Sequence, residues 1–354
     1  MDKTFIVAEA GANHNRDLSM AMELIDVAVD SKVDAIKFQT YSSETLYSKY
    51  TPDFAGYKDI PKLMKDIELP RDWQKTLKSK CDDSGIEFMS TPFDEKAVDE
   101  LFDLGVKRFK IAGFEATDPR FVKYVATTGL PLIISLGIGS DLNTMFNIQR
   151  LIYDLDDVID VHMGIYDFTN EQQITYLHCN NAYPTPIGDI NLGQMESMLS
   201  LCNNHKWFAN TNAGLSDHTE GILIPPIAVS LGAKVIEKHF TLDRSLSGPD
   251  HPFAIEPNEL KDMVKNIRLA ESSMGEKKSK YTDSEVGFSM ARRSVVAKRD
   301  ILMGSVLTEE NITTKRPLLN DSISAEKYFD MIGKQINVDV KEDEIILKDM
   351  IYYG

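Results

Sequence analysis

Eight short runs of apolar and β-branched residues recur along the first 241 residues, and longer amphipathic stretches separate them. Strands that alternate with helices predict a parallel sheet. Eight such units in about 275 residues predict a closed (β/α)₈ TIM barrel. An open, doubly wound sheet is the alternative, which is disfavoured because no GxGxxG motif follows the first run. The runs lie at 5–11, 35–41, 87–93, 108–113, 131–137, 174–181, 213–218 and 235–241.

The character of the sequence changes after residue 275. Residues 276–290 are mostly polar and predict a linker. Further on, RDILMGSVLTEENI (299–312) and VDVKEDEIILKDMI (338–351) share the spacing of their apolar residues. Two similar β units predict a small, pseudo-symmetric, β-rich domain. We therefore expect a barrel at 1–275, a linker at 276–290 and a small domain at 291–354.

Composition excludes several classes of partner. The net charge of −16 argues against a nucleic-acid partner, which would need a basic face. No run approaches the roughly 20 apolar residues that span a bilayer, so we expect no membrane partner. The apolar stretch in MDKTFIVAEAG is too short for a signal peptide. Three cysteines, Cys81, Cys179 and Cys202, without a CxxC motif favour a reducing, cytoplasmic location.

Polar side chains gather where the predicted strands end. In a barrel, the carboxyl ends of the strands meet on one face, so these side chains should converge on one site. Any one of them is explained equally well by a capping or salt-bridging role, but the whole set is not. They are Glu9, Lys37, Gln39, Ser90, Thr91, Lys110, Glu115, Ser135, Asn181, Tyr183, Ser216, His218, Glu237 and His239, with Asp250 beyond the last strand.

His218 and His239 are the candidate metal ligands. Each follows or closes a predicted strand, with one helix between them, so both should lie at the same end of neighbouring strands. Two imidazoles leave coordination positions open for water and substrate, which is typical of a catalytic site. Mixed nitrogen and oxygen ligation suits Mn²⁺, Mg²⁺, Co²⁺ or Zn²⁺. The alternative is two unrelated histidines, each hydrogen-bonded to a backbone carbonyl.

The remaining strand-end groups divide by chemistry. Cations and hydroxyls suit a phosphate group. Amide, phenol and carboxylate groups near the last strands suit a polyhydroxylated ligand. Glu9 and Glu115 are candidate acid–base or charge-stabilising carboxylates. The candidate phosphate ligands are Lys37, Lys110, Ser135 and Ser216, and the candidate hydroxyl-binding residues are Asn181, Tyr183 and Asp250.

The motifs AEAGANHN, KFQTY, FMSTPFD, KIAGFE, LHCNNAYPTP, GLSDHT, EKHFT and GPD occur in the order found in the sialic acid synthase family. The chain resembles this family over almost its whole length, and RRSVVAKRDI with KRP resembles the family's C-terminal antifreeze-like (SAF, β-clip) domain. The resemblance implies condensation of phosphoenolpyruvate with an N-acylated hexosamine, either N-acetylmannosamine or a diacetamido-trideoxyhexose. The products would be a nine-carbon, sialic-acid-type keto sugar acid and phosphate.

The resemblance also implies a cofactor, an assembly and a role for each matching residue. It implies a divalent metal at His218 and His239, with Mn²⁺ favoured and Mg²⁺ or Co²⁺ as alternatives, and a domain-swapped homodimer. Arg316 of KRP would be inserted from the partner chain. Phosphoenolpyruvate would be held by Lys37, Lys110, Ser135 and Ser216, and the sugar by Asn181, Tyr183 and Asp250, with Glu115 beside the reacting carbons and Glu9 near the sugar. Gln39, Ser90 and Gly113 are further expected substrate contacts.

Three positions depart from the family pattern. Gly113 stands where the family has serine, although a backbone N–H there could replace the hydroxyl. Leu136 stands where the family has threonine, and LLNDSIS follows KRP in place of a glycine-rich turn. Two other functions therefore stay open: a catalytically altered barrel that acts as a sugar-binding or structural protein, and a Schiff-base aldolase that uses Lys110.

Overall fold

The computed structural model describes residues 3–153, 172–275 and 281–352. The chain divides into two compact units, Met1–Gly275 and Glu276–Gly354, and each unit is described by itself.

The first unit is a closed barrel of eight parallel strands, as the sequence predicts. Each predicted run overlaps one strand. The order across the sheet is β3-β2-β1-β8-β7-β6-β5-β4, and β4 lies beside β3, which closes the barrel. The strands are β1 (Phe5–Gly11), β2 (Ala35–Thr40), β3 (Glu87–Pro92), β4 (Phe109–Ile111), β5 (Leu132–Leu136), β6 (Ile174–Cys179), β7 (Thr211–Asp217) and β8 (Val235–His239).

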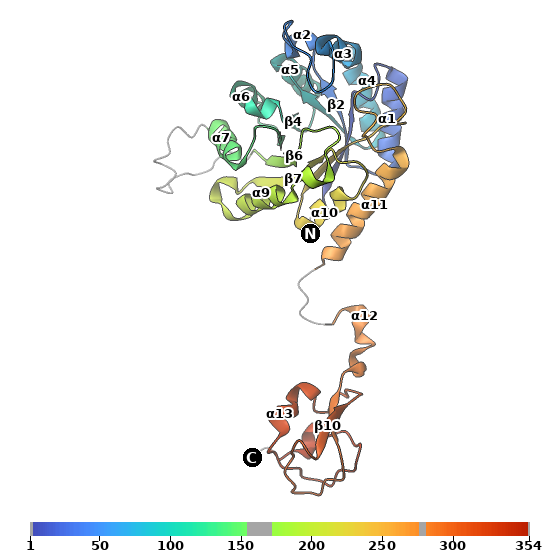
Figure 1. Ribbon diagram of the computed structural model, residues 1–354, viewed down its shortest axis with the longest axis vertical. Helices are drawn as coiled ribbons and strands as arrows, with labels where there is room; N and C mark the ends of the chain where they lie inside the picture. Colours follow the sequence, from blue (N-terminus) through green and yellow to red (C-terminus); the bar gives the residue numbers. More distant parts are fainter. Residues whose placement is uncertain (1–2, 154–171, 276–280, 353–354) are drawn as a thin grey trace. The chain divides into compact units, whose positions relative to one another are not determined.

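Helices surround the strands (Figure 1). Several begin at a side chain that accepts the first free backbone N–H groups: Asp17 caps α1, Asp94 caps α5 and Asp118 caps α6. The surrounding helices are α1 (Leu18–Asp30), α4 (Gln74–Ser84), α5 (Glu95–Leu104), α6 (Pro119–Ala126), α7 (Leu142–Ile152), α9 (Leu192–Asn204), α10 (Ile224–Leu231) and α11 (Pro257–Met274).

Two connections are long in the sequence. The connection at 42–70 folds into the short helices α2 (Ser43–Leu46) and α3 (Ile60–Ile67). The second predicted long connection, 156–173, lies outside the described residues except for its last two. None of the helices in the described part of the chain is long and apolar enough to cross a membrane.

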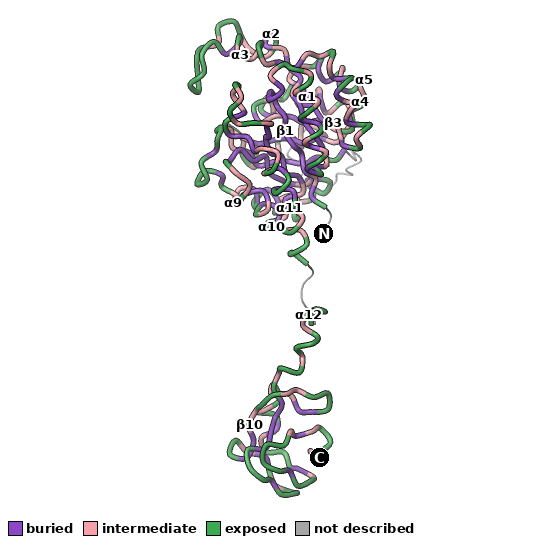
Figure 2. Tube along the Cα trace, turned by 90° about the vertical axis from the view of Figure 1, so that its right-hand side faces the viewer, coloured by how far each residue is buried: buried purple, intermediate pink, exposed green. Residues whose placement is uncertain are grey.

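The strands place apolar and polar residues in successive layers of the barrel lumen. Side chains alternate between the two faces of a strand, so residues two apart share a face. The first lumen layer is apolar and consists of Val7, Ala35, Met89, Ile133, Leu177 and Val235. Two residues further along the same strands come Glu9, Lys37, Thr91, Ser135, Cys179 and Glu237, all buried. Figure 2 shows the buried interior of this unit in purple. The apolar layer therefore seals the barrel beneath a polar one.

The opposite face of the strands packs against the helices. The larger apolar core lies there and includes Ile6, Ala8, Ile36 and Phe38 from the first two strands. A β-strand residue one position away from a lumen residue thus belongs to this outer layer.

The second unit is small and rich in β structure, as predicted. Strands β9 (Ser294–Ala297) and β10 (Ile312–Lys315) pair antiparallel. The two halves of the sequence repeat meet directly, because Ile301 pairs with Val340. The described part of the predicted linker contains α12 (Asp283–Val286) and the start of a 3₁₀ helix, η5 (Ser289–Ala291); α13 (Tyr328–Met331) follows later.

Candidate functional site

The carboxyl ends of the barrel strands enclose a cavity of about 350 Å³, including its open mouth. It brings together most of the residues predicted from the sequence. The predicted residues in its lining are Glu9, Lys37, Gln39, Thr91, Lys110, Gly113, Ser135, Asn181, Tyr183, Ser216, His218, Glu237 and His239. Phe93, Ala112 and Cys179 complete the lining.

Two lysines and two glutamates form the floor of this cavity. Nζ of Lys37 lies 2.5 Å from Oε2 of Glu9 and 3.7 Å from Oε1 of Glu237. Nζ of Lys110 lies 3.3 Å from the same oxygen of Glu237. All four side chains are at most 4% exposed. Buried charges are stable only when paired, so the four groups hold one another in place.

Glu237 is the shared partner in this network. Sequence reasoning placed it at a strand end but gave it no role. Burial alone would raise the pKa of Glu237, but the ammonium groups of Lys110 and Lys37 outweigh burial and lower it to about 2. Its Oε1 also accepts a hydrogen bond of 3.1 Å from Ser216. Glu237 is therefore an anion that fixes both lysines and one predicted phosphate-binding hydroxyl.

Glu9 differs from Glu237 in the direction of its pKa shift. Burial raises the pKa of Glu9, although the Lys37 ammonium opposes the shift. Its second oxygen accepts a hydrogen bond of 2.9 Å from Gln39. Glu9 thus links Lys37 at the floor to Gln39 higher on the same strand pair.

His218 and His239 face each other across one side of the cavity, with ring centroids 5.3 Å apart. Nδ1 of His218 lies 2.7 Å from the carbonyl oxygen of Asn180. When Nδ1 donates to this carbonyl, the lone pair of Nε2 is left for a ligand. Burial, and then the nearby His239 ring, lowers the pKa of His218 to about 3, so this imidazole is neutral at pH 7.

The histidine pair fits a divalent cation. Nδ1 of His239 is buried and has no hydrogen-bond partner among the described residues. Oδ2 of Asp250 lies 3.4 Å from this nitrogen. No group of three or more His, Cys, Asp or Glu side chains in the described ranges has the arrangement of a metal site, so a cation at the two imidazoles would need further ligands from water or substrate. A neutral, buried imidazole is the form that binds a metal.

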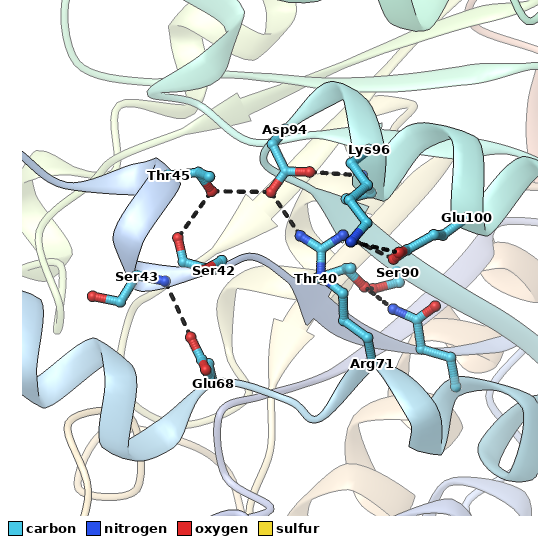
Figure 3. Close-up of polar contacts among 12 residues, drawn as sticks. Thr40, Ser42, Ser43, Thr45, Glu68, Arg71, Ser90, Asp94, Lys96 and Glu100 are labelled. Carbon is cyan, nitrogen blue, oxygen red and sulfur yellow. Dashed lines mark hydrogen bonds and ion pairs between the residues drawn. The ribbon is translucent and has the colours of Figure 1, made fainter.

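The predicted assignment of Ser90 is wrong. Ser90 faces the helices, where its hydroxyl lies 2.7 Å from that of Thr40 (Figure 3). Thr91 faces the cavity instead and accepts a hydrogen bond of 3.0 Å from Lys37. The reason is strand register: Gln39 pairs with Thr91, so these two residues share the lumen face.

Asn181 occupies the space above two glycines. Its Oδ1 accepts a hydrogen bond of 2.7 Å from the backbone N–H of Ile138. A Cβ on Gly137 would lie 1.7 Å from this oxygen, so the Asn181 side chain would have to move to admit one, and a Cβ on Gly113 would lie 3.3 Å from the same amide. Leu136, the other departure from the family pattern in the barrel, is buried in the core beneath the helices and does not line the cavity.

Ser135 and Tyr183 supply further polar groups. The hydroxyl of Ser135 is buried and has no hydrogen-bond partner in the described structure, so it is free to bind a ligand. Tyr183 lies against His218, with ring centroids 4.2 Å apart, and its OH lies 3.5 Å from Nδ2 of Asn181.

A second, wider cavity of about 1,510 Å³ adjoins the first, since Phe93 lines both. Glu115 lies in the lining of this second cavity, and burial raises the pKa of its carboxyl group. Arg71 and Thr45 both bind the carboxylate of Asp94, at 2.7 and 3.1 Å (Figure 3). These contacts tie the 42–70 connection, and Arg71 directly after it, to the segment between β3 and α5. Arg316 lies in the second unit and is exposed.

Comparisons with known proteins agree with the fold. Residues 24–279 match the NeuB family, and residues 292–351 match the SAF domain. The chain is 38% identical to the N,N'-diacetyllegionaminic acid synthase of Campylobacter jejuni over 98% of its length and 99% of the relative's. It is 36% identical to the synthase of the same name from Legionella pneumophila, over 98% and 94% of the two chains. Among solved structures it resembles the N-acetylneuraminic acid (sialic acid) synthetase of Leptospira borgpetersenii, with a TM-score of 0.68 and 31% identity over 81% and 90% of the two chains.

The fold and the site thus define a TIM-barrel protein with a C-terminal SAF domain. The chain belongs to the NeuB family, the family of sialic-acid-type synthases that the motifs indicated.

Proposed function

We propose that this protein condenses phosphoenolpyruvate with an N-acylated hexosamine to form a sialic-acid-type keto sugar acid and phosphate. One observation carries the proposal: two buried lysines and a pair of buried imidazoles line the same cavity. The lysines suit a phosphate, and the imidazoles suit a dication. The relatives named as N,N'-diacetyllegionaminic acid synthases favour a diacetamido-trideoxyhexose as the acceptor, with N-acetylmannosamine as the alternative.

The floor residues bind the phosphate and carboxylate of phosphoenolpyruvate. Lys37 and Lys110 supply the positive charge, and Glu237 keeps both ammonium groups in place before the substrate arrives. The free hydroxyl of Ser135 donates a hydrogen bond to the phosphate. Because these groups are already ordered, little reorganisation is needed when charge develops on the phosphate.

The acceptor lies above, toward the mouth. Asn181 and Tyr183 bind its hydroxyl groups, while Asp250 is held near His239. A dication held by His218 and His239, with Mn²⁺ favoured, would polarise the aldehyde oxygen of the open-chain sugar.

The chemistry forms one carbon–carbon bond and one carbon–oxygen bond, the latter from water, and breaks the carbon–oxygen bond to phosphate. The methylene carbon of phosphoenolpyruvate attacks the aldehyde carbon, and C2 acquires oxocarbenium character. Glu115, whose pKa is raised by burial, stabilises this charge or takes a proton from the water that adds to C2. Phosphate then leaves with its bridging oxygen, and C2 becomes the ketone.

We further propose that the active assembly is a domain-swapped homodimer in the cytoplasm, in which the partner's Arg316 completes the site. The family resemblance supports this assembly. The direct test of the proposed reaction is a mass-spectrometric screen of phosphoenolpyruvate against N-acetylmannosamine and the two diacetamido-trideoxyhexoses. Borohydride trapping with pyruvate tests the Schiff-base alternative at Lys110, because only an aldolase of that kind would be trapped.

A further inference from the structure

A buried lysine lies directly beside His239 in the sequence but on the other face of its strand. Lys238 is 2% exposed and points away from the cavity, toward the layer beneath the helices. Its Nζ lies 2.7 Å from Oδ2 of Asp217, whose side chain is fully buried. Neither residue lines the cavity, so neither contacts a substrate there.

Lys238 contacts the residues on both sides of His218. Its ammonium group binds the carboxylate of Asp217 and also donates a hydrogen bond to the backbone carbonyl of Thr219. Asp217 and Thr219 are the residues on either side of His218. One cation from β8 therefore holds both neighbours of the histidine that follows β7.

Asp217 closes the segment further. Its other oxygen, Oδ1, accepts hydrogen bonds from the backbone N–H of Thr219 at 3.0 Å and from the Thr219 hydroxyl at 2.8 Å. The carbonyl of His218 accepts a hydrogen bond of 2.9 Å from the N–H of Thr185. The backbone around His218 is thus fixed from both sides, and its ring lies with Nδ1 2.7 Å from the Asn180 carbonyl oxygen.

We propose that Lys238 is a positioning residue for His218, and that it sets the geometry of the two imidazoles through Asp217 and Thr219. Since Lys238 precedes His239, a single dipeptide of β8 then provides one imidazole directly and orients the other. This inference rests on the proposed metal role of the histidine pair. Groups that orient a metal ligand affect metal affinity even though they never touch the metal.

We call the ion pair between Lys238 and Asp217 the clamp. The test removes both of its charges, so that no unpaired charge is left buried. The double variant Lys238→Met/Asp217→Asn loses both charges, so it avoids the large penalty of an unpaired buried ion. The matched control is Arg108→Met/Glu87→Gln, which removes an ion pair of 2.7 Å at the amino ends of β3 and β4, away from the cavity. Thermal unfolding of the full-length chains measures what each pair contributes to stability.

Two readouts follow the position of His218. Electron paramagnetic resonance of free Mn²⁺ gives the dissociation constant, which should rise on the order of 10-fold to 100-fold in the clamp variant and stay unchanged in the control. In the metal-free protein labelled with ¹⁵N-histidine, the protected Nδ1–H signal of His218 should be present in the wild type and the control and lost in the clamp variant.

The outcomes separate the two proposals. If the clamp variant keeps both the wild-type Mn²⁺ affinity and the His218 Nδ1–H signal, whatever its melting temperature, Lys238 does not position His218. If the wild type and His218→Ala bind Mn²⁺ equally, the metal role fails, whereas loss of the Nδ1–H signal in the clamp variant alone still supports the positioning.

Discussion

The ammonium nitrogen of Lys110 lies 3.3 Å from Oε1 of Glu237, which the Lys37 ammonium also approaches to 3.7 Å. With Glu9, the floor of the cavity contains two ammonium groups and two carboxyl groups. When both carboxyl groups are ionised, this floor has no net charge. A bound phosphate ester therefore adds negative charge that these groups alone do not neutralise.

This charge balance predicts that phosphoenolpyruvate and the dication favour each other's binding. Saturating Mn²⁺ should lower the Kd of phosphoenolpyruvate by roughly 5-fold to 150-fold, the usual range of coupling between two sites. Isothermal titration calorimetry with and without Mn²⁺ measures the effect, and His218→Ala should abolish it. Equal affinities in Mn²⁺ and in chelator would contradict the predicted coupling.

Lys110→Ala tests the phosphate assignment. The variant loses a cation that is almost fully buried. It should therefore lose on the order of 2–4 kcal/mol of transition-state stabilisation, measured as a lower kcat/KM for phosphoenolpyruvate. Steady-state kinetics of phosphate release measures it, with the exposed Lys107→Ala as the control. Normal use of phosphoenolpyruvate by Lys110→Ala would remove the assignment.

Substitutions of the adjacent residues Ser90 and Thr91 on β3 test which face of the strand contacts the substrate. Thr91→Val removes the hydroxyl that binds Lys37 and should raise KM for phosphoenolpyruvate. Ser90→Ala removes the hydrogen bond to Thr40 and should lower stability by about 1 kcal/mol while kinetics stay unchanged. The reverse pattern would place Ser90, and not Thr91, in the site.

Stability should fall with acid in part because of His14. Burial, followed by the charge of Arg16, lowers the pKa of His14 from 6.5 to about 4. Between these values the unfolded chain binds a proton that the folded chain does not, so stability decreases as the pH falls from 6.5 to 4 and is unaffected above 6.5.

The variant His14→Gln isolates this contribution. Its free energy of unfolding should depend less steeply on pH than that of the wild type, by about 1.4 kcal/mol per pH unit in this window. Urea unfolding at a series of pH values gives both slopes. Identical slopes would show that His14 is not held in its neutral form.

Mixing two inactive variants tests the proposed exchange of Arg316. In a domain-swapped dimer, a chain with His218→Ala still supplies Arg316 to the intact barrel of an Arg316→Ala partner. After co-refolding, half of the dimers are mixed and each contains one complete site, so about a quarter of wild-type activity should return. No recovery would mean that Arg316 acts within its own chain, and an Arg316→Ala variant that is active before mixing would mean that Arg316 is not needed.

The barrel could be predicted from the sequence because its strands are short apolar runs between amphipathic helices, and each predicted run overlaps a strand. The convergence of strand-end polar groups followed from the same topology. The face of the strand on which each side chain lies could not be predicted in the same way. Ser90 and Thr91 are adjacent hydroxyl residues, and only the pairing of Gln39 with Thr91 decides between them.

The electrostatic partners also required the structure. Glu237 and Lys238 are consecutive charged residues, yet one binds two lysines in the cavity and the other binds Asp217 outside it. Distances between strands that are far apart in the sequence set these roles. The local pattern of residue types along the sequence contains no information on such distances.

The most direct test of the proposed reaction is the fate of the bridging oxygen of phosphoenolpyruvate. Substrate labelled with oxygen-18 between C2 and phosphorus is incubated with Mn²⁺ and each of the three acceptors, and both products are analysed by mass spectrometry. We predict a nine-carbon keto sugar acid with one acceptor, an equal amount of phosphate, and the label in the phosphate. Retention of the label in the organic product, or no new acid with any acceptor, would contradict the proposed function.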